Sequence, residues 1–238
     1  MTTQKLPTIS VVIPTLNDEA QLRELLAELQ KLTFQPDEII IVDANSSDLT
    51  SEVVKENKSK LILSEVKGRG QQIKIAVENA RSDIVLILHA DIGIEDEIIH
   101  LVSKQMAETN VPGGAIGSRF DCETEKMKPI ENLNRWRASV LGLSFGDQGQ
   151  FFWREKAIKG KWIQNLPIME DLELSLQMRK NGKPLWLNGG IVSSTRNWDR
   201  KNRFFNSMKL VSFIICYLIM RHFNKQFITQ KIYQWYYK

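Results

Sequence analysis

The chain has 238 residues, of which 42% are hydrophobic and 25% are charged, a composition typical of a globular protein rather than a disordered one. This length fits one large domain, or one domain with an appended tail. The two cysteines, Cys122 and Cys216, stand far apart and outside any CxxC pattern, which argues against a disulfide framework and a zinc site. The polar N-terminus lacks the apolar stretch of a secretory signal, so we expect a cytoplasmic protein.

The net charge of +4 is distributed unevenly along the chain. Residues 200–238 hold eight Lys or Arg residues, all four tyrosines, and no Asp or Glu. By charge counting this leaves about −4 for residues 1–199. We therefore divide the chain into a mildly acidic body, residues 1–199, and a basic, aromatic-rich helical tail, residues 200–238.

Four strand–helix units follow one another in the first part of the body. Short apolar runs predict strands at Ile9–Pro14, Glu38–Val42, Leu61–Leu63 and Ile84–Leu88. Helices are predicted from the capping pair Asn17-Asp18 onward, through Val53-Val54, and from about Gln71 to Ala80. This alternation predicts an α/β fold with a mostly parallel, Rossmann-like sheet flanked by helices.

The pattern is less regular after the fourth strand. We expect a helix over residues 98–106, a turn into a strand at 113–117, and a mobile charged loop at 121–130. A glycine-flanked turn, residues 146–149, leads into an aromatic strand that ends at Trp153. Met169-Glu170-Asp171 opens a helix that runs to Lys180 and is closed by Asn181-Gly182.

Two carboxylates follow predicted strands, at the edge of the sheet where ligands of such folds bind. Asp91 could hold Mg²⁺ or Mn²⁺ together with substrate phosphates, or it could equally cap the next segment. Asp43 could bond a nucleotide base or ribose, or it could cap its own turn through Ser46 and Ser47.

Two further residues are candidates for phosphate and proton chemistry. Arg69 lies between two glycines that would let backbone approach a diphosphate, although Gly-Arg-Gly is often only a flexible turn. Asp171 at a helix start is a candidate general base. The helix N-terminus tends to lower its pKa and the adjacent Glu170 tends to raise it. The alternative is a first-turn acid that complements the helix dipole.

In order and spacing these segments resemble family 2 glycosyltransferases over roughly residues 8–200. The segments that carry the resemblance are Val11–Asn17, Val42–Thr50, Gly68–Gln72, Leu88–Asp91 and Met169–Asp171. The Leu-His-Ala-Asp form, together with Gly146–Gly149 and Ser193–Trp198, is similar to a bacterial subgroup described as associated with radical-SAM proteins.

The resemblance implies a GT-A catalytic domain over residues 1–199 that moves a sugar from a nucleotide-diphosphate donor in one inverting displacement. It implies that Asp171 is the general base and that Asp91 binds a divalent metal ion, Mn²⁺ or Mg²⁺. The implied donor residues are Thr15, Asn17, Glu19, Asp43 and Arg69. The implied acceptor-side residues are Gly146, Asp147, Gln148, Glu170, Arg196 and Trp198.

Two departures from the family pattern matter. The usual Asp-x-Asp is His89-Ala90-Asp91 here, so one expected carboxylate is missing, and His89 is either a second metal ligand or a structural histidine. The Gln-x-x-Arg-Trp motif of processive polymer synthases is absent, which predicts single transfer.

The tail contains an eleven-residue run, Leu210–Met220, in which only Ser212 is polar. A membrane-spanning helix needs about 20 apolar residues, so this run is too short. It could be a core or homodimer helix, or an interfacial helix on an anionic membrane that brings the enzyme to a lipid-linked acceptor. The second option would place the protein peripherally on the inner face of the plasma membrane. Nucleic-acid binding is disfavoured, because the basic residues do not line one polar face with interleaved aromatics.

Two other functions compete with the glycosyltransferase. A nucleotidyltransferase normally has a glycine- and arginine-rich loop after the first strand, where this chain has Pro14–Asn17. A catalytically silent sugar-nucleotide-binding scaffold is disfavoured by Asp91 and Asp171, although the missing first carboxylate leaves it open.

Overall fold

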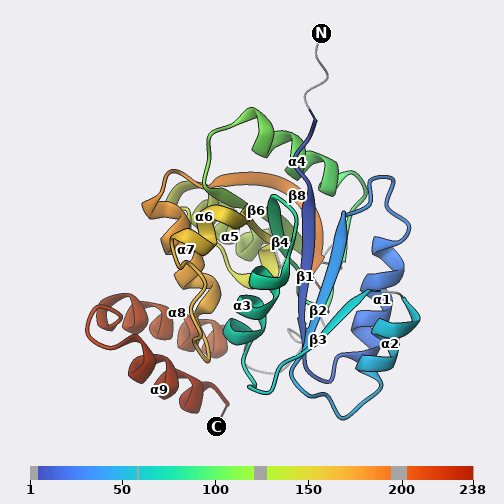
Figure 1. Cartoon of the computed structure of the whole chain (residues 1–238). Helices are drawn as coiled ribbons and strands as arrows, with labels where there is room; N and C mark the ends of the chain where they lie inside the picture. The colour runs from blue at the N-terminus through green and yellow to red at the C-terminus, as the bar shows by residue number, and fades with distance from the viewer. Residues whose placement is uncertain (1–4, 58, 121–127, 194–202, 238) are drawn as a thin grey trace.

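The computed structural model describes residues 5–57, 59–120, 128–193 and 203–237. These residues form one sheet with the strand order β3-β2-β1-β4-β7-β6-β8-β5, flanked by helices (Figure 1). The strands are β1 (Ile9–Thr15), β2 (Glu38–Asp43), β3 (Lys60–Leu63), β4 (Ile84–Ile87), β5 (Ile92–Ile94), β6 (Gly113–Phe120), β7 (Gln150–Trp153) and β8 (Leu185–Ser193).

The helices before β7 are α1 (Glu19–Leu29), α2 (Thr50–Glu56), α3 (Arg69–Asn79), α4 (Ile98–Glu108), α5 (Lys128–Leu141) and the short 3₁₀ helix η1 (Gly146–Gln148). Those after it are α6 (Arg154–Lys159), α7 (Glu170–Lys180), α8 (Arg203–Met220) and α9 (Lys225–Tyr237).

The predicted parallel arrangement holds for the first four strands. β1 pairs in parallel with β2 and β4, and β2 pairs in parallel with β3. The rest of the sheet is mixed, because β7 runs antiparallel to both β4 and β6, and β5 runs antiparallel to β8. The α/β prediction is confirmed. Periodicity could not give the direction of β7, since the chain between β4 and β7 first forms β5, α4, β6 and α5, and their packing decides how β7 joins the sheet.

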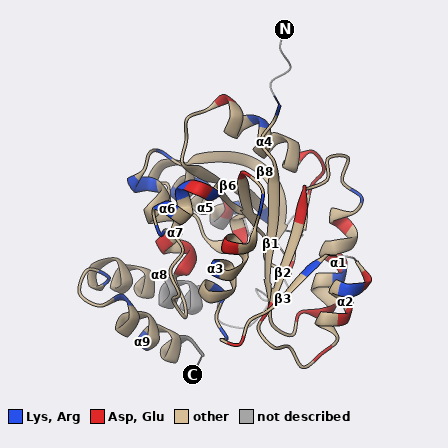
Figure 2. Cartoon of the chain, viewed as in Figure 1, with Lys and Arg blue, Asp and Glu red and all other residues tan. Residues whose placement is uncertain are grey.

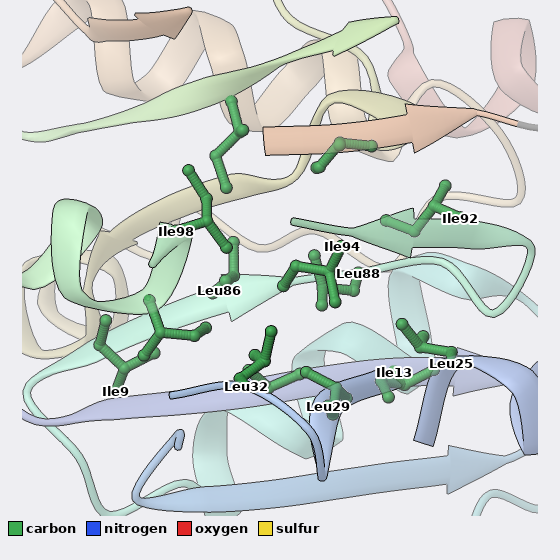
Figure 3. Close-up of a cluster of buried hydrophobic side chains, with 14 of the residues drawn as sticks. Ile9, Ile13, Leu25, Leu29, Leu32, Leu86, Leu88, Ile92, Ile94 and Ile98 are labelled. Atoms are coloured by element: carbon green, nitrogen blue, oxygen red, sulfur yellow. The ribbon is translucent and has the colours of Figure 1, made fainter. Parts of the chain in front are cut away.

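Both faces of the sheet are covered, which explains why its central strands are continuous apolar runs. On one face the leucines of α1 pack against β1 and against the segment around β5 (Figure 3). Leu22, Leu25, Leu26 and Leu29 of α1 are buried, at the spacing that places them on one side of a helix. On the other face α3, α6 and α7 contribute to a second core around Val12, Val85 and Phe152.

Three local predictions were wrong in part. Asp18 is the N-cap residue of α1, as predicted, but its side chain does not cap the helix: its carboxylate accepts the Leu16 N–H at 2.9 Å, and Asp48 accepts the Glu19 N–H at 3.1 Å. The strand expected at 113–117 is present, but it begins at Gly113 without a preceding turn in that segment. There β6 pairs so closely with β7 that a Cβ on Gly113 would lie 2.3 Å from a β7 carbonyl oxygen. The expected loop at 121–130 is helical from residue 128 onward, and residues 121–127 lie outside the described part of the chain.

The tail folds as two helices that pack on the body, and its predicted apolar run lies within α8. Phe213 and Tyr217 of α8 and Ile228 and Ile232 of α9 form a core with Leu172 of α7. Within the described residues, no helix combines the length and apolar character needed to cross a bilayer.

Candidate active site

The carboxyl ends of β1 and β2 meet at the edge where the donor residues were predicted. Thr15 and Asp43 are register partners and both are buried. The Asp43 carboxylate accepts hydrogen bonds from the Ser46 N–H at 3.1 Å, from the Ser46 hydroxyl, and from the Ser51 hydroxyl at 3.3 Å. The turn-capping role of Asp43 is therefore present. Among the described residues, no group bonds the buried Thr15 hydroxyl, which leaves it available to a ligand.

The loops that follow β1 and β2 are joined by hydrogen bonds. Asn17 adopts a left-handed conformation with φ 57°, and its side-chain oxygen accepts the Ser47 N–H at 2.8 Å. Glu19 accepts the Leu49 N–H at 3.4 Å and forms an ion pair with Arg23 at 3.8 Å. The predicted donor residues Thr15, Asn17, Glu19 and Asp43 therefore share one edge of the sheet.

A buried amide fastens α3 to this edge. The Gln72 Nε2 donates to the Thr15 carbonyl at 2.8 Å and to the Val42 carbonyl at 2.7 Å. Buried carbonyls that point out of a strand end need such donors. Gln72 lies within the Gly68–Gln72 segment, but its position in the sequence gave no indication of this role.

Arg69 is the first residue of α3, where the free N–H groups and the helix dipole favour a bound anion. Gly68 before it has φ +136°, a conformation that favours glycine. The Arg69 Nε forms an ion pair with Glu170 Oε1 at 3.1 Å. Burial raises the pKa of Glu170 to about 7, with Arg69 opposing the rise and Asp171 adding to it. The two predicted residues, far apart in sequence, are therefore in contact.

The Asp171 carboxylate is fixed by two backbone donors. Its Oδ2 accepts the Gly146 N–H at 2.9 Å, and its Oδ1 accepts the Leu172 N–H at 2.6 Å. A Cβ on Gly146 would lie 2.4 Å from His89 Nε2, so only glycine fits between that ring and α7. Two of the predicted acceptor-side residues, Gly146 and Glu170, therefore lie beside the predicted base.

Asp147 and Gln148 lie in the same turn, next to a cation that the sequence gave no signal for. The Arg137 Nη2 donates to Gln148 Oε1 at 2.9 Å, and its guanidinium carbon lies 3.4 Å from the centre of the Phe145 ring. Burial lowers the pKa of Arg137 to about 10, so it stays protonated at neutral pH. Burial also raises the pKa of Asp147, with Arg137 opposing. The predicted Arg196 and Trp198 lie outside the described residues.

Asp91 is exposed and lines a cleft of about 650 Å³ between α1 and β5, together with Asp18. Burial and the charge of Arg69 lower the pKa of His89 to about 3, so its imidazole is neutral at pH 7. No cluster of three metal-ligating side chains occurs in the described part of the chain. These residues fit a cation held by Asp91 and by substrate phosphates, and not a preformed metal centre.

Comparison with known proteins gives the family of this fold and site. The model for glycosyl transferase family 2 matches residues 10–161, more than half of the chain. The chain belongs to glycosyl transferase family 2. This family 2 protein is 26% identical over 207 residues to the probable glycosyltransferase YdaM of Bacillus subtilis, covering 75% of this chain and 48% of the relative.

A second relative of this glycosyltransferase is an undecaprenyl-phosphate 4-deoxy-4-formamido-L-arabinose transferase of Pseudomonas fluorescens. The two are 28% identical over 152 residues, which cover 59% of this chain and 44% of the relative. The chain therefore spans about half the length, or less, of these two curated relatives.

Solved structures confirm the GT-A fold. The Staphylococcus aureus TarS structure aligns with a TM-score of 0.66 at 19% identity, covering 86% of this chain and 39% of TarS. The Pyrobaculum calidifontis mannosyltransferase PcManGT, in complex with GDP-Man and Mn²⁺, aligns with a TM-score of 0.64 at 19% identity. That alignment covers 88% of this chain and 62% of PcManGT.

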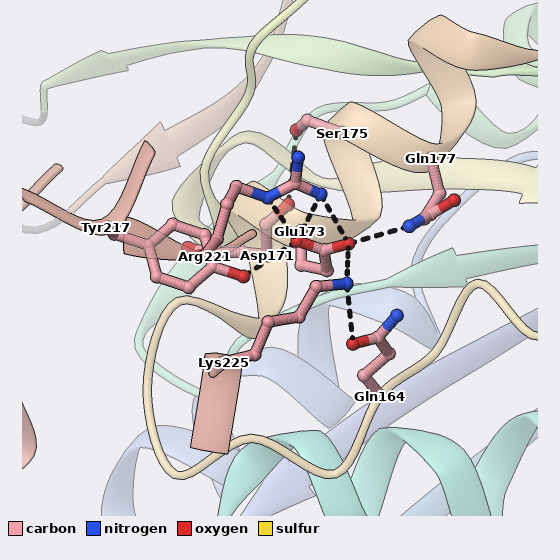
Figure 4. Close-up of polar contacts among 8 residues, drawn as sticks. All are labelled: Gln164, Asp171, Glu173, Ser175, Gln177, Tyr217, Arg221 and Lys225. Carbon is pink, nitrogen blue, oxygen red and sulfur yellow. Dashed lines mark hydrogen bonds and ion pairs between the residues drawn. The ribbon is translucent and has the colours of Figure 1, made fainter. Parts of the chain in front are cut away.

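The first turn of α7 also anchors the tail of this glycosyltransferase (Figure 4). Glu173 is fully buried. Its carboxylate accepts hydrogen bonds from Tyr217 at 2.7 Å, Lys225 at 2.8 Å, Gln177 at 2.6 Å, and Arg221 at 2.8 to 3.1 Å. Burial alone raises the pKa of Glu173, but these donors outweigh it and lower the pKa to about 2. In the sequence, only its position two residues after Asp171 pointed to a role for Glu173.

Proposed function

We propose that this family 2 glycosyltransferase moves one sugar from a nucleoside-diphosphate donor to a hydroxyl acceptor, with inversion and with Asp171 as the general base. The observation that carries the proposal is the Asp171 carboxylate, fixed by the Gly146 and Leu172 N–H groups beside the Arg69–Glu170 pair. This arrangement supports a general base and a phosphate-binding cation at adjacent points of one site.

The reaction needs one proton transfer and one displacement. The acceptor hydroxyl gives its proton to Asp171, and its oxygen attacks the anomeric carbon. The bond from that carbon to the diphosphate breaks, and the leaving diphosphate takes the bonding electron pair. A positioned base of this kind contributes roughly 10²- to 10⁴-fold in rate.

The donor would bind across the ends of β1 and β2. Asp43 and the unbonded Thr15 hydroxyl would contact the base or ribose, with Asn17 and Glu19 shaping the loop around them. Arg69, whose side chain is 44% exposed, would contact the diphosphate. Asp91 would hold Mn²⁺ or Mg²⁺, which supplies positive charge to the diphosphate when bound. The PcManGT complex with GDP-Man and Mn²⁺ supports such a donor–metal pair.

The acceptor side would be formed by the turn at Gly146–Gln148 and by Glu170, with Arg196 and Trp198 as further predicted members. A lipid-linked acceptor is one candidate, supported by the name of the undecaprenyl-phosphate transferase relative. Such an acceptor would place the enzyme on the cytoplasmic face of a membrane. Placement in the radical-SAM-associated subgroup, homodimer formation and single rather than processive transfer stay predictions.

Nucleotide-dependent thermal stability is the first test of the donor site. UDP, GDP, CDP and dTDP are compared, each with and without Mn²⁺. A ligand at 100-fold over its Kd stabilises the folded state by about 2.7 kcal/mol. One nucleotide that raises the Tm in a metal-dependent way supports the donor site and names the base. If none of the four nucleotides changes the Tm, the result counts against the proposed transferase function.

The role of Asp171 is tested by Asp171→Asn, with release of nucleoside diphosphate from the matching nucleotide sugar as the readout. We expect the nucleotide-induced Tm shift to remain and turnover to fall roughly 10²-fold or more. Asp96→Asn is the matched control, since Asp96 is an exposed carboxylate that bonds Thr33 and should leave turnover unchanged. Nucleotide binding without turnover in the wild type would favour the silent sugar-nucleotide-binding scaffold instead.

A further inference from the structure

The outer side of the α8–α9 hairpin carries large apolar side chains that contact water. Three of them recur every four residues along α8, which places them on one side of that helix. Two further exposed residues follow along the chain, Phe223 between the helices and Phe227 in the first turn of α9. This apolar row consists of Val211, Ile215, Ile219, Phe223 and Phe227, which are 49%, 52%, 64%, 87% and 53% exposed.

The body of the chain does not cover the apolar row. The opposite side of the hairpin already packs on α7, through Phe213, Tyr217 and Ile232. Arg221 and Lys225, on that inner side, form ion pairs with the buried Glu173. Five large apolar side chains exposed within residues 211–227 are more than the single exposed residues usual on a protein surface, and they indicate an interaction site.

The positive charge of the tail indicates that the partner of the apolar row is negatively charged. Residues 200–238 contain eight Lys or Arg residues and no Asp or Glu. On the coloured ribbon of α8 and α9, Figure 2 shows blue and no red. Glu173 carries one negative charge against the two positive charges of Arg221 and Lys225, so the hairpin keeps a net positive charge from its basic residues. Lys231 is one of them, and its Nζ lies 5.7 Å from the centre of the Phe227 ring, directly beside the row. Apolar side chains bordered by cations complement a bilayer with anionic headgroups.

We propose that the apolar row docks the protein on the surface of an anionic membrane. The aromatic and aliphatic side chains enter the headgroup region, and Lys231 beside them contacts lipid phosphates. The hairpin lies at the end of the molecule where the parallel strands β1, β2 and β3 have their carboxyl ends (Figure 1). Docking therefore keeps the catalytic edge close to the bilayer. The inference goes beyond the transferase reaction, because it rests on the surface of the tail alone.

Flotation of the full-length protein with vesicles tests the proposal. Vesicles of phosphatidylcholine alone are compared with vesicles of phosphatidylcholine and phosphatidylglycerol in equal amounts. We expect the protein to float with the anionic vesicles, and less so at high salt, because salt screens the attraction. Phe223→Glu should lower the partition coefficient about tenfold or more. Phe223 makes so little packing contact that this variant should keep its fold.

Leu49→Glu is the matched control. Leu49 is 56% exposed, precedes α2 and lies outside the apolar row, so the variant should float like the wild type. The proposal is overturned if the wild type stays in the soluble fraction with anionic vesicles, or if Phe223→Glu floats unchanged. It is also overturned if light scattering finds a wild-type dimer that Phe223→Glu converts to a monomer while neither floats, because the row is then a subunit interface. A nucleotide-dependent Tm shift is measured separately, so failure here leaves the transferase proposal standing.

Discussion

Replacing Glu173 by glutamine should destabilise the protein strongly. The substitution keeps the size and most of the polarity of the side chain but removes the negative charge that pairs with Arg221 and Lys225. The Arg221 side chain is 7% exposed and the Glu173 side chain is fully buried. Removing one partner of such a buried ion pair leaves an uncompensated charge, which costs about 3 to 5 kcal/mol.

The pKa of Glu173, which reflects the same contacts, gives a figure of the same size. It lies near 2 in the folded protein, against 4.5 for an unperturbed glutamate. A pKa that is lowered by folding stabilises the protein above the unfolded value, and the gain is lost as the pH falls through the folded value. The shift corresponds to about 3 kcal/mol at pH 7. At pH 4 the contribution should be about 1 kcal/mol smaller.

Urea denaturation at pH 7 and pH 4 measures both quantities. The control is Glu155→Gln, because Glu155 forms an i,i+4 ion pair with Lys159 in which both side chains are more than 70% exposed. Such exposed pairs contribute little to stability, because water screens them. We expect the free energy of unfolding to fall by about 3 kcal/mol or more in Glu173→Gln and to change little in the control.

The reasoning would be refuted if Glu173→Gln lost less than about 1 kcal/mol at pH 7. It would also be refuted if the difference from wild type were the same at pH 4 as at pH 7, since the charge of Glu173 would then not be the cause. A double-mutant cycle with Arg221→Gln separates the pair from its surroundings, and a coupling near zero would show that the two residues act independently.

Two further predictions concern the active site. Gly146→Ala should lower the free energy of unfolding by about 1 to 3 kcal/mol and reduce donor turnover at least tenfold. The added Cβ would lie 2.4 Å from His89 Nε2 and would shift the contact with Asp171. A urea midpoint and a turnover equal to those of the wild type would contradict this prediction. Glu170→Gln should gain stability relative to wild type between about pH 4.5 and pH 8, because the raised pKa of about 7 means that wild type loses stability as the pH rises through it. The gain should reach up to about 3 kcal/mol, and a difference that stays constant across this range would show that Glu170 does not titrate there.

The site divides clearly into what the sequence could predict and what it could not. Asp43, Asp91 and Asp171 each stand at the end of a strand or the start of a helix, where short-range patterns place a side chain well. Arg137 has no such marker, because its importance comes from a packing contact with η1. Likewise, the missing first carboxylate of the metal motif was visible at once, whereas the neutral state of His89 depends on the atoms that enclose it.

By itself, the sequence determined the α/β class, the four parallel strands from β1 to β4 and the edge where the polar residues gather. These follow from apolar runs of strand length and from helical spacing, which are properties of neighbouring residues. Only the tertiary structure decided the antiparallel entry of β7, the meeting of Gly146 with His89 and Asp171, and the attachment of the tail through Glu173. Each of these joins segments far apart in the chain, and such contacts depend on how the whole sheet closes and not on any local pattern.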